Sequence, residues 1–451
     1  MRPIAGSALV WVAATTAWAG GSVVVDHPGP NGLAVAGLEV DRPLEVRIEA
    51  VVPATRPAAT NWFWLFQPNV ADDDDEAGTA WLLDGATRQP VWQFDRKSAG
   101  TLRGALKRQE ARVRLSPGRY ELYLYAGPLT ASRRGGDDFW SRFLQGGPSN
   151  ADRARDESYV ALRAEGVAAG ELRRFEVDGD LPAAVVRLNR TGDSVLRSAG
   201  LAVRQPAVVR LYGAAEHATG WREPADFGWL IDAETRVVLW RSAAAPYRHA
   251  GGGRKNRRID DVVRLQPGRY ELYFGTDGSH AYPNFNTTPP LDPYNWGVSV
   301  LVESGGSGAV EAFDIPRERP PAIDLRRAGD DVRSERAFRL ARDGSLLVQA
   351  LGECPIGQRC TDRAWIVEAG SQRELWRMDR DNTLDAGGSD KNRMFDGLVK
   401  LPRGSYVLHY ASDDSHSYAG WNDGAPFRPA AWGVAAWPGP GLPAEALSVA
   451  P

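Results

Sequence analysis

Apolar and polar residues alternate with a period of two along many short segments of the chain. The clearest of these segments are residues 44–48, 120–125, 209–213, 270–274, 347–351 and 406–410. This alternation predicts β-strands with one buried face, because successive side chains of a strand point to opposite sides. No long segment carries a convincing helical period, and Gly and Pro cluster between the apolar runs. The pattern therefore predicts an all-β protein with many turns.

One block of residues occurs three times along the chain. Three tryptophan pairs have the same spacing of 11 residues: Trp81 and Trp92, Trp229 and Trp240, Trp365 and Trp376. Each pair is followed by the sequence Leu-x-x-Gly-x-Tyr, which ends at Tyr120, Tyr270 and Tyr406. Positions kept in all three blocks are expected to serve the fold, so we assign the tryptophan pairs and the Gly-x-Tyr turns to sandwich cores and turns.

The repeated block divides the chain into domain-sized parts. With some eight short strands in each part, two packed antiparallel sheets bury the apolar faces most economically. We predict three tandem β-sandwiches of jelly-roll type, which we call repeats 1, 2 and 3. Their predicted bounds are 20–178, 179–316 and 317–451, after a leader at 1–19.

The chain begins with a predicted secretory signal. Arg2 precedes a short apolar run from Ile4 to Thr16, and Ala17 and Ala19 supply the small residues that a signal peptidase recognises. We expect cleavage after Ala19 and a secreted or periplasmic protein. An uncleaved membrane anchor is the alternative, although the apolar run is shorter than the roughly 20 residues of a span.

The two cysteines of the chain, Cys354 and Cys360, lie in one loop of repeat 3. In an oxidising compartment they would most simply form a disulfide. A zinc site would need further Cys or His nearby, and a redox pair normally has two intervening residues rather than five. Two free thiols remain the alternative.

The charge of the chain is balanced. It has 54 Lys and Arg against 57 Asp and Glu, for a formal net charge of −3. Without a broad basic field, nucleic acid is not an expected partner. An extracellular glycan, peptide or protein is the expected partner class, with no cofactor.

The order of these signals resembles the pre-peptidase C-terminal type of secreted bacterial jelly-roll module. The matching elements in repeat 3 are Phe338–Leu340, Trp365–Glu368 and Leu401–Tyr406, and they cover about half of the repeat. The long segment between the Ser-His-x-Tyr sequence and Trp432 departs from that family, and we expect no protease domain among the residues before the repeats. The resemblance implies a non-catalytic accessory or binding module and transfers no site residues.

A layer of polar residues is shared by repeats 2 and 3 and is mostly missing from repeat 1. A Lys-Asn-Arg sequence, with an aspartate three residues later, recurs after 136 residues; so does a Ser-His-x-Tyr sequence with an Asn six residues after its His. The candidate ligand-binding residues of this layer are Lys255, Asn256, Arg257, Asp277, His280 and Asn286 in repeat 2, and Lys391, Asn392, Arg393, Asp413, His416 and Asn422 in repeat 3.

Two interpretations of the polar layer stay open at the level of sequence. Planar amide and guanidinium groups beside aromatic rings suit a sugar or a peptide end. The same groups are also common means of satisfying the backbone of a long loop. An open pocket lined by these side chains would favour binding, whereas mutual hydrogen bonds beneath Trp432 would favour a structural clasp.

Catalytic and metal-binding patterns give little support to an enzyme. We find no Gly-x-Ser-x-Gly, His-Glu-x-x-His or phosphate-binding Gly-x-x-x-x-Gly-Lys followed by Ser or Thr. The acidic run Asp72–Asp75 could hold calcium, but a solvated turn explains it more simply.

We therefore predict a secreted, non-catalytic repeat protein that binds through loops of repeats 2 and 3. A purely structural or assembly protein of the cell envelope is the first alternative. A hydrolase with a site assembled across repeats is the second alternative.

Overall fold

The computed structural model describes residues 21–26, 32–54, 78–102, 106–127, 157–164, 172–179, 181, 183–218, 223–244, 246, 248–306, 308–316 and 319–450. The predicted leader at 1–19 and the Asp72–Asp75 run lie outside them. The described chain divides into two compact units. Unit 1 comprises residues 1–180, 248–258 and 282–296, and unit 2 comprises residues 181–247, 259–281 and 297–451.

Repeat 1 contains two five-stranded antiparallel sheets, with strand orders β1-β9-β3-β7-β6 and β10-β2-β8-β4-β5. Its strands are β1 (Ser22–Asp26), β2 (Leu33–Val40), β3 (Leu44–Pro53), β4 (Thr79–Asp84), β5 (Pro90–Gln93), β6 (Gly100–Thr101), β7 (Leu106–Leu115), β8 (Gly118–Tyr125), β9 (Tyr159–Ala164) and β10 (Leu172–Phe175).

Repeat 2 contains sheets of order β11-β18-β13-β16 and β15-β14-β17-β12-β19. Its elements are β11 (Ala184–Leu188), β12 (Leu196–Val203), β13 (Ala207–Glu216), β14 (Phe227–Asp232), β15 (Val238–Arg241), η2 (Ser242–Ala244), β16 (Asn256–Leu265), β17 (Gly268–Gly275), η3 (Pro293–Asn295), β18 (Gly297–Ser304) and β19 (Val310–Phe313).

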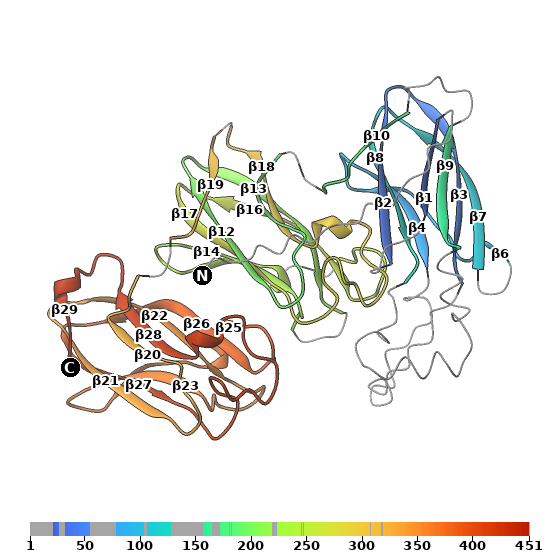
Figure 1. Ribbon diagram of the computed structural model, residues 1–451. Helices are drawn as coiled ribbons and strands as arrows, with labels where there is room; N and C mark the ends of the chain where they lie inside the picture. The colour runs from blue at the N-terminus through green and yellow to red at the C-terminus, as the bar shows by residue number, and fades with distance from the viewer. Residues whose placement is uncertain are drawn as a thin grey trace, which may run out of the picture. The chain divides into compact units, whose positions relative to one another are not determined.

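Repeat 3 contains sheets of order β20-β28-β22-β26-β25 and β24-β23-β27-β21-β29, which form the two layers seen in Figure 1. Its elements are β20 (Ile323–Arg326), β21 (Arg333–Leu340), β22 (Gly344–Glu353), β23 (Arg363–Glu368), β24 (Glu374–Arg377), η4 (Arg380–Asn382), β25 (Leu384–Asp385), β26 (Asn392–Leu401), β27 (Gly404–Ala411), η5 (Pro429–Ala431), β28 (Gly433–Pro438), η6 (Ala444–Ala446) and β29 (Leu447–Val449).

The all-β, antiparallel class predicted from the sequence is confirmed. Each repeat has one main core cluster that takes residues from both of its sheets. In repeat 1, Ile48 of β3 and Leu122 of β8 are fully buried members of this cluster. The only helices among the described residues are short 3-10 turns, and none is long and apolar enough to cross a membrane.

The repeat tyrosine has the same structural role in all three repeats. Its ring is buried at the start of β8, β17 and β27, and its hydroxyl donates a hydrogen bond to the carbonyl four residues earlier. These bonds are 2.9 Å from Tyr120 to Ser116, 2.7 Å from Tyr270 to Gln266 and 2.6 Å from Tyr406 to Pro402. The Gly-x-Tyr layer therefore secures the turn before a central strand, as a position kept in all repeats should.

The first tryptophan of each pair departs from the expectation that both lie in the core. In repeats 1 and 2, Trp81 and Trp229 belong to separate apolar clusters, outside the main cores. The cause is the period of the strand: Leu82 and Leu230 point into the cores, so their neighbours must point to the opposite face. We call the sheet that carries this residue the tryptophan sheet: it contains β4, β14 or β23.

Candidate functional site

The polar layer of repeat 3 holds together two loops, residues 384–391 and 412–428. Asn392 opens β26, and its amide nitrogen donates to the carbonyls of Gly387 and Gly424, each at 2.8 Å. Backbone bonds from Ser389 to Gly424 (3.0 Å) and from Phe427 to Ala386 (2.8 Å) join the same two loops. We call these paired loops the projection of repeat 3.

His416 lies at the centre of this arrangement and is fully buried. Its Nε2 is 2.6 Å from Oδ1 of Asn392, and its Nδ1 is 2.8 Å from Oδ1 of Asn422. Because the amide nitrogen of Asn392 already donates twice, its oxygen must accept, so Nε2 of His416 carries a proton. The ring also packs edge-on against Trp421 and Trp432.

Burial and the nearby charge of Lys391 lower the pKa of His416. Lys391 donates to Asn422 at 3.0 Å and forms an ion pair with Glu353 at 3.1 Å. Lys391 thus bonds Asn422, and His416 bonds Asn392 with its ring against Trp432. Nδ1 of His416 donates to Asn422 only when the ring is doubly protonated, so this bond acts to raise the pKa of His416 against the two other causes. This is the geometry expected of the structural interpretation.

Left-handed backbone and close glycine contacts explain the local sequence of the projection. His416 has φ 54°, and Gly387 and Gly388 have φ 79° and 73°. A Cβ on Gly388 would lie 2.1 Å from the carbonyl oxygen of Ala425, so no other residue fits without moving the loop. The glycines allow the two loops to approach closely enough for Asn392 to reach both.

Repeat 2 has an equivalent pair of loops, residues 248–255 and 282–295, which belongs to unit 1. Asn256 donates to the carbonyls of Gly251 at 2.8 Å and Thr288 at 2.9 Å, as Asn392 does in repeat 3. His280, within unit 2, is fully buried with φ 54°, which matches His416. Lys255 is half-buried and Asn286 is exposed. We call these loops the projection of repeat 2.

Each projection covers the tryptophan sheet of the preceding repeat. In unit 1, Trp81 stacks on Tyr123 at 4.9 Å between ring centres, and Leu291 and Tyr294 of the projection join their cluster. The indole of Trp81 donates to the Leu291 carbonyl at 2.8 Å. In unit 2, Trp229 stacks on Tyr273 at 5.0 Å, and Phe427 joins their cluster.

A buried arginine lies beside each of these aromatic stacks. Arg88, in the turn after β4, bonds Glu121 of its own sheet at 2.6 Å and Asp292 of the projection at 2.9 Å. In unit 2, Arg236 in the equivalent turn bonds Glu271 at 2.8 Å and Asp396 at 3.2 Å. Burial alone would lower the pKa of each arginine, but the two carboxylates raise it above its ordinary value.

The candidate residue Arg393 also reaches the preceding repeat. Its side chain is 7% exposed and donates to Glu223 of repeat 2 at 2.8 Å. Arg380 donates to the other oxygen of Glu223, also at 2.8 Å. Burial acts to raise the pKa of Glu223, but Arg393 and Arg380 act more strongly in the opposite direction. The pKa of Glu223 is therefore below its ordinary value. In repeat 2 the corresponding Arg257 is buried.

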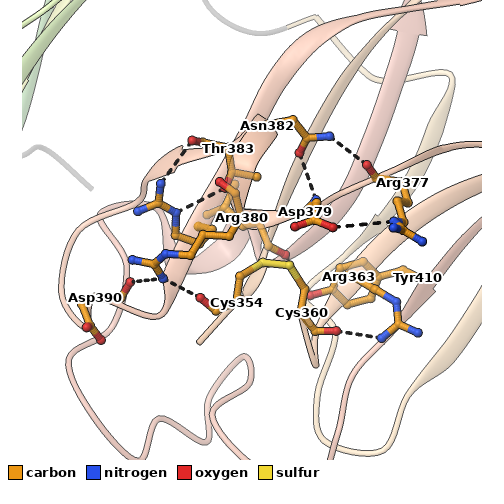
Figure 2. Close-up of a disulfide and its surroundings, with 12 residues drawn as sticks. Cys354, Cys360, Arg363, Arg377, Asp379, Arg380, Asn382, Thr383, Asp390 and Tyr410 are labelled. Carbon is orange, nitrogen blue, oxygen red and sulfur yellow. Dashed lines mark hydrogen bonds and ion pairs between the residues drawn. A yellow bond between two sulfur atoms is a disulfide. The ribbon is translucent and has the colours of Figure 1, made fainter. Parts of the chain in front are cut away.

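The disulfide between Cys354 and Cys360 is present, as predicted. Figure 2 shows the surroundings of its loop: Arg380 donates to the carbonyls of Cys354 at 2.6 Å and Asp390 at 3.1 Å, and Arg363 donates to the carbonyl of Cys360 at 2.7 Å. Arg380 therefore links the disulfide loop to the loop 384–391 of the projection.

Carboxylates gather at both ends of the disulfide loop. Oxygen atoms of Glu353, Asp362 and Asp413 lie within 4.8 Å of one another, and Glu216, Asp226 and Asp277 form an equivalent group in repeat 2. Both groups could hold a cation by ligand type. In repeat 3, however, protein donors occupy Asp362: the amide of Asp413 and the indole of Trp432, each at 3.0 Å.

Burial raises the pKa of Asp362 to about 7, and the nearby charges of Asp413 and Glu353 act in the same direction. Asp362 is fully buried, so a dissolved substrate has no direct contact with it. The arrangement suits a structural group better than a general acid or base that acts on an external molecule.

Sequence reasoning missed the arginines Arg88 and Arg236 and the carboxylates Glu353 and Asp362. The arginines follow the first tryptophan by seven residues in repeats 1 and 2, where repeat 3 has Gln372. The buried aspartates Asp226 and Asp362 lie 51 residues before Asp277 and Asp413, respectively, and accept hydrogen bonds from their amides. A comparison of repeat 1 with repeat 2, and not only of repeat 2 with repeat 3, would have exposed the arginines.

Comparison with known protein families and with curated proteins finds no match to this chain. The resemblance to the pre-peptidase C-terminal module stays a prediction.

Proposed function

We propose that this chain is a non-catalytic structural repeat protein whose polar layer joins successive repeats. One observation carries the proposal: the Lys-Asn-Arg segment of repeat 3, with its aspartate, points into contacts within the protein. Asn392 holds the two loops of the projection, Arg393 bonds Glu223, and Asp396 bonds Arg236.

The distribution of the polar layer supports the same conclusion. Repeats 2 and 3 each follow another repeat, and these are the repeats that carry the layer. Repeat 1 mostly lacks it. In a tandem array each repeat buries part of its surface against its neighbours, and residues of the layer that contact a preceding repeat serve that purpose.

Export to an oxidising compartment is part of the proposal. The disulfide supports it, because such bonds persist mainly outside the reducing cytosol. We place the protein in the cell envelope or outside the cell, as a spacer or assembly component. Ligand binding by His416 and Asn422 stays a prediction that the burial of His416 does not favour.

A double-mutant cycle tests the joining role. Arg393→Met and Glu223→Met should each lower the free energy of unfolding, and together they should cost less than the sum, with a coupling of roughly 1–3 kcal/mol. Arg204→Met and Glu311→Met, an exposed ion pair within repeat 2 that lies outside the polar layer, provide the matched cycle and should show no measurable coupling. Additive losses at Arg393 and Glu223 would contradict the proposal.

Glycan and peptide arrays separate the structural role from the binding role. We expect His416→Ala to lower the free energy of unfolding by roughly 1–3 kcal/mol, because buried hydrogen-bonding groups lose their partner. Asn422→Ala should cost less, since Asn422 is exposed. A ligand that stabilises the wild-type chain but not a folded Asn422→Ala variant would instead favour a binding protein.

A further inference from the structure

The tryptophan sheet of repeat 3 carries the same aromatic stack as the sheets covered by projections. Trp365 of β23 stacks on His409 of β27 with 4.8 Å between ring centres and 8° between ring planes. Trp81 and Trp229 are 1% and 3% exposed, whereas Trp365 remains partly exposed and lies outside the core cluster of its repeat. This face therefore has the same aromatic stack as the other two, but its tryptophan is less buried.

The residues that recognise a projection are replaced on this face. Gln372 stands where repeats 1 and 2 have Arg88 and Arg236, in the same left-handed turn with φ 56°. Val407 stands where they have Glu121 and Glu271. Without the arginine, an acidic residue such as Asp292 or Asp396 would be buried without an opposite charge, which is strongly unfavourable. A projection of the kind seen in repeats 2 and 3 is therefore a poor occupant.

The register of the sheet gives this face a pattern that complements itself. One row across β24, β23, β27 and β21 reads Arg377, Trp365, His409, Glu335. A second chain placed face to face, and related by a two-fold axis parallel to the strands, presents the same row in reverse. Arg377 then lies opposite Glu335 of the second chain, and Trp365 lies opposite His409. The equivalent rows read Gln93-Trp81-Tyr123-Val35 and Arg241-Trp229-Tyr273-Ser198, without opposite charges at their ends.

We propose that this face is a self-association surface that pairs with the same face of a second copy of the chain. An interface around a two-fold axis uses one patch twice, so a row with Arg at one end and Glu at the other satisfies itself. The aromatic pair lies in the centre of the row and the charges lie at its ends, which is the usual distribution of apolar and polar residues in an interface.

Present contacts of Glu335 and Arg377 do not oppose this pairing, and the guanidinium of Arg363, 5.5 Å from the centre of the Trp365 ring, is the other charged group beside the aromatic pair. Glu335 is 3.3 Å from Nδ1 of His409, and Arg377 is 3.4 Å from Glu374 and 3.6 Å from Asp379. The side chains of Glu335 and Arg377 are 71% and 48% exposed. Exposed ion pairs contribute little, so these side chains can take new partners at small cost.

Sedimentation equilibrium of the full chain over a range of concentrations tests the proposal. The average mass should rise toward twice that of one chain. Trp365→Ala, Arg377→Glu and Glu335→Arg should each weaken association by roughly tenfold or more, and the double reversal Arg377→Glu with Glu335→Arg should restore most of it. Arg377 and Glu335 lie three strand spacings apart in one sheet, about 14 Å, so restoration must arise between chains.

Lys400→Glu, a charge reversal at an exposed residue of the other sheet, is the matched control and should leave association unchanged. Thermal melts establish that each variant is folded. A chain that stays monomeric at every concentration overturns the proposal, as does association that survives Trp365→Ala and Arg377→Glu. Association that both single reversals abolish and the double reversal fails to restore overturns the two-fold arrangement, and with it the proposal.

Discussion

Replacing Arg236 with methionine tests the most strongly buried charge contact between repeats 2 and 3. The side chains of Arg236, Glu271 and Asp396 are 7%, 12% and 11% exposed, so water scarcely screens them. Methionine keeps much of the length of arginine but removes its charge and its donors. Glu271 and Asp396 would then be buried with like charge and without their common partner.

The expected loss follows from this burial. Removing one member of a buried ion pair costs about 3–5 kcal/mol, because the remaining charge is desolvated without compensation. For a domain of this size, 1 kcal/mol corresponds to about 2–4 °C in melting temperature, so we expect a decrease of roughly 10 °C. Scanning calorimetry at pH 7 measures it.

Two further variants sharpen the measurement. Arg210→Met disrupts the more exposed pair with Asp260, where side chains are 33% and 20% exposed, and should cost no more than about 1 kcal/mol. The triple variant Arg236→Met, Glu271→Leu, Asp396→Leu should recover much of the stability, because apolar packing can replace a buried ion cluster. Equal losses in Arg236→Met and Arg210→Met would refute the reasoning.

Three other predictions concern repeat 3 and its contact with repeat 2. Gly275→Ala should destabilise the chain, because its Cβ would lie 2.4 Å from the ring of Phe427, and adding Phe427→Leu should relieve the loss; a Gly275→Ala variant with a wild-type urea midpoint would contradict this. Burial raises the pKa of Asp362 to about 7, above the value near 4 of an unfolded aspartate, so its protonated form stabilises the fold and that contribution is lost as pH rises from about 4 to 7. The melting temperature of the wild-type chain should therefore fall relative to Asp362→Asn over this range, and a constant difference would exclude the shift. Replacing Cys354 and Cys360 with alanine should lower the free energy of unfolding by about 2 kcal/mol, because the disulfide closes a short loop. A reducing agent should destabilise the wild-type chain by a similar amount and leave the double variant unchanged. If the reducing agent also destabilised the double variant, the loss could not be assigned to this disulfide.

The strands and their class could be predicted because they depend on local chemistry. Alternation over 44–48 requires one face of β3 to be buried whatever covers it, and the turn before Tyr120 needs only a glycine and a nearby carbonyl. The disulfide was predictable for a similar reason, since two cysteines six residues apart have few other partners.

The role of the polar layer could not be read in the same way. His416 and Asn392 are 24 residues apart. The sequence shows that both recur at the same distance from their counterparts in repeat 2, but it does not show whether their side chains face each other or solvent. The first tryptophan of each pair was assigned to the core because large apolar residues are usually buried there. Trp81 and Trp229 are indeed buried, but by loops of the following repeat.

The sequence by itself determined the all-β class, the threefold repetition of one block and many of the strand positions, and it favoured a disulfide between the two cysteines. Each of these depends on residues close together in the chain or on a period along it. Only the tertiary structure decided what the polar residues contact. Arg236 and Asp396 are 160 residues apart, and Arg88 and Asp292 are 204 apart. Contacts over such separations depend on which surfaces the folded repeats present to one another, and no local pattern of polarity encodes that choice.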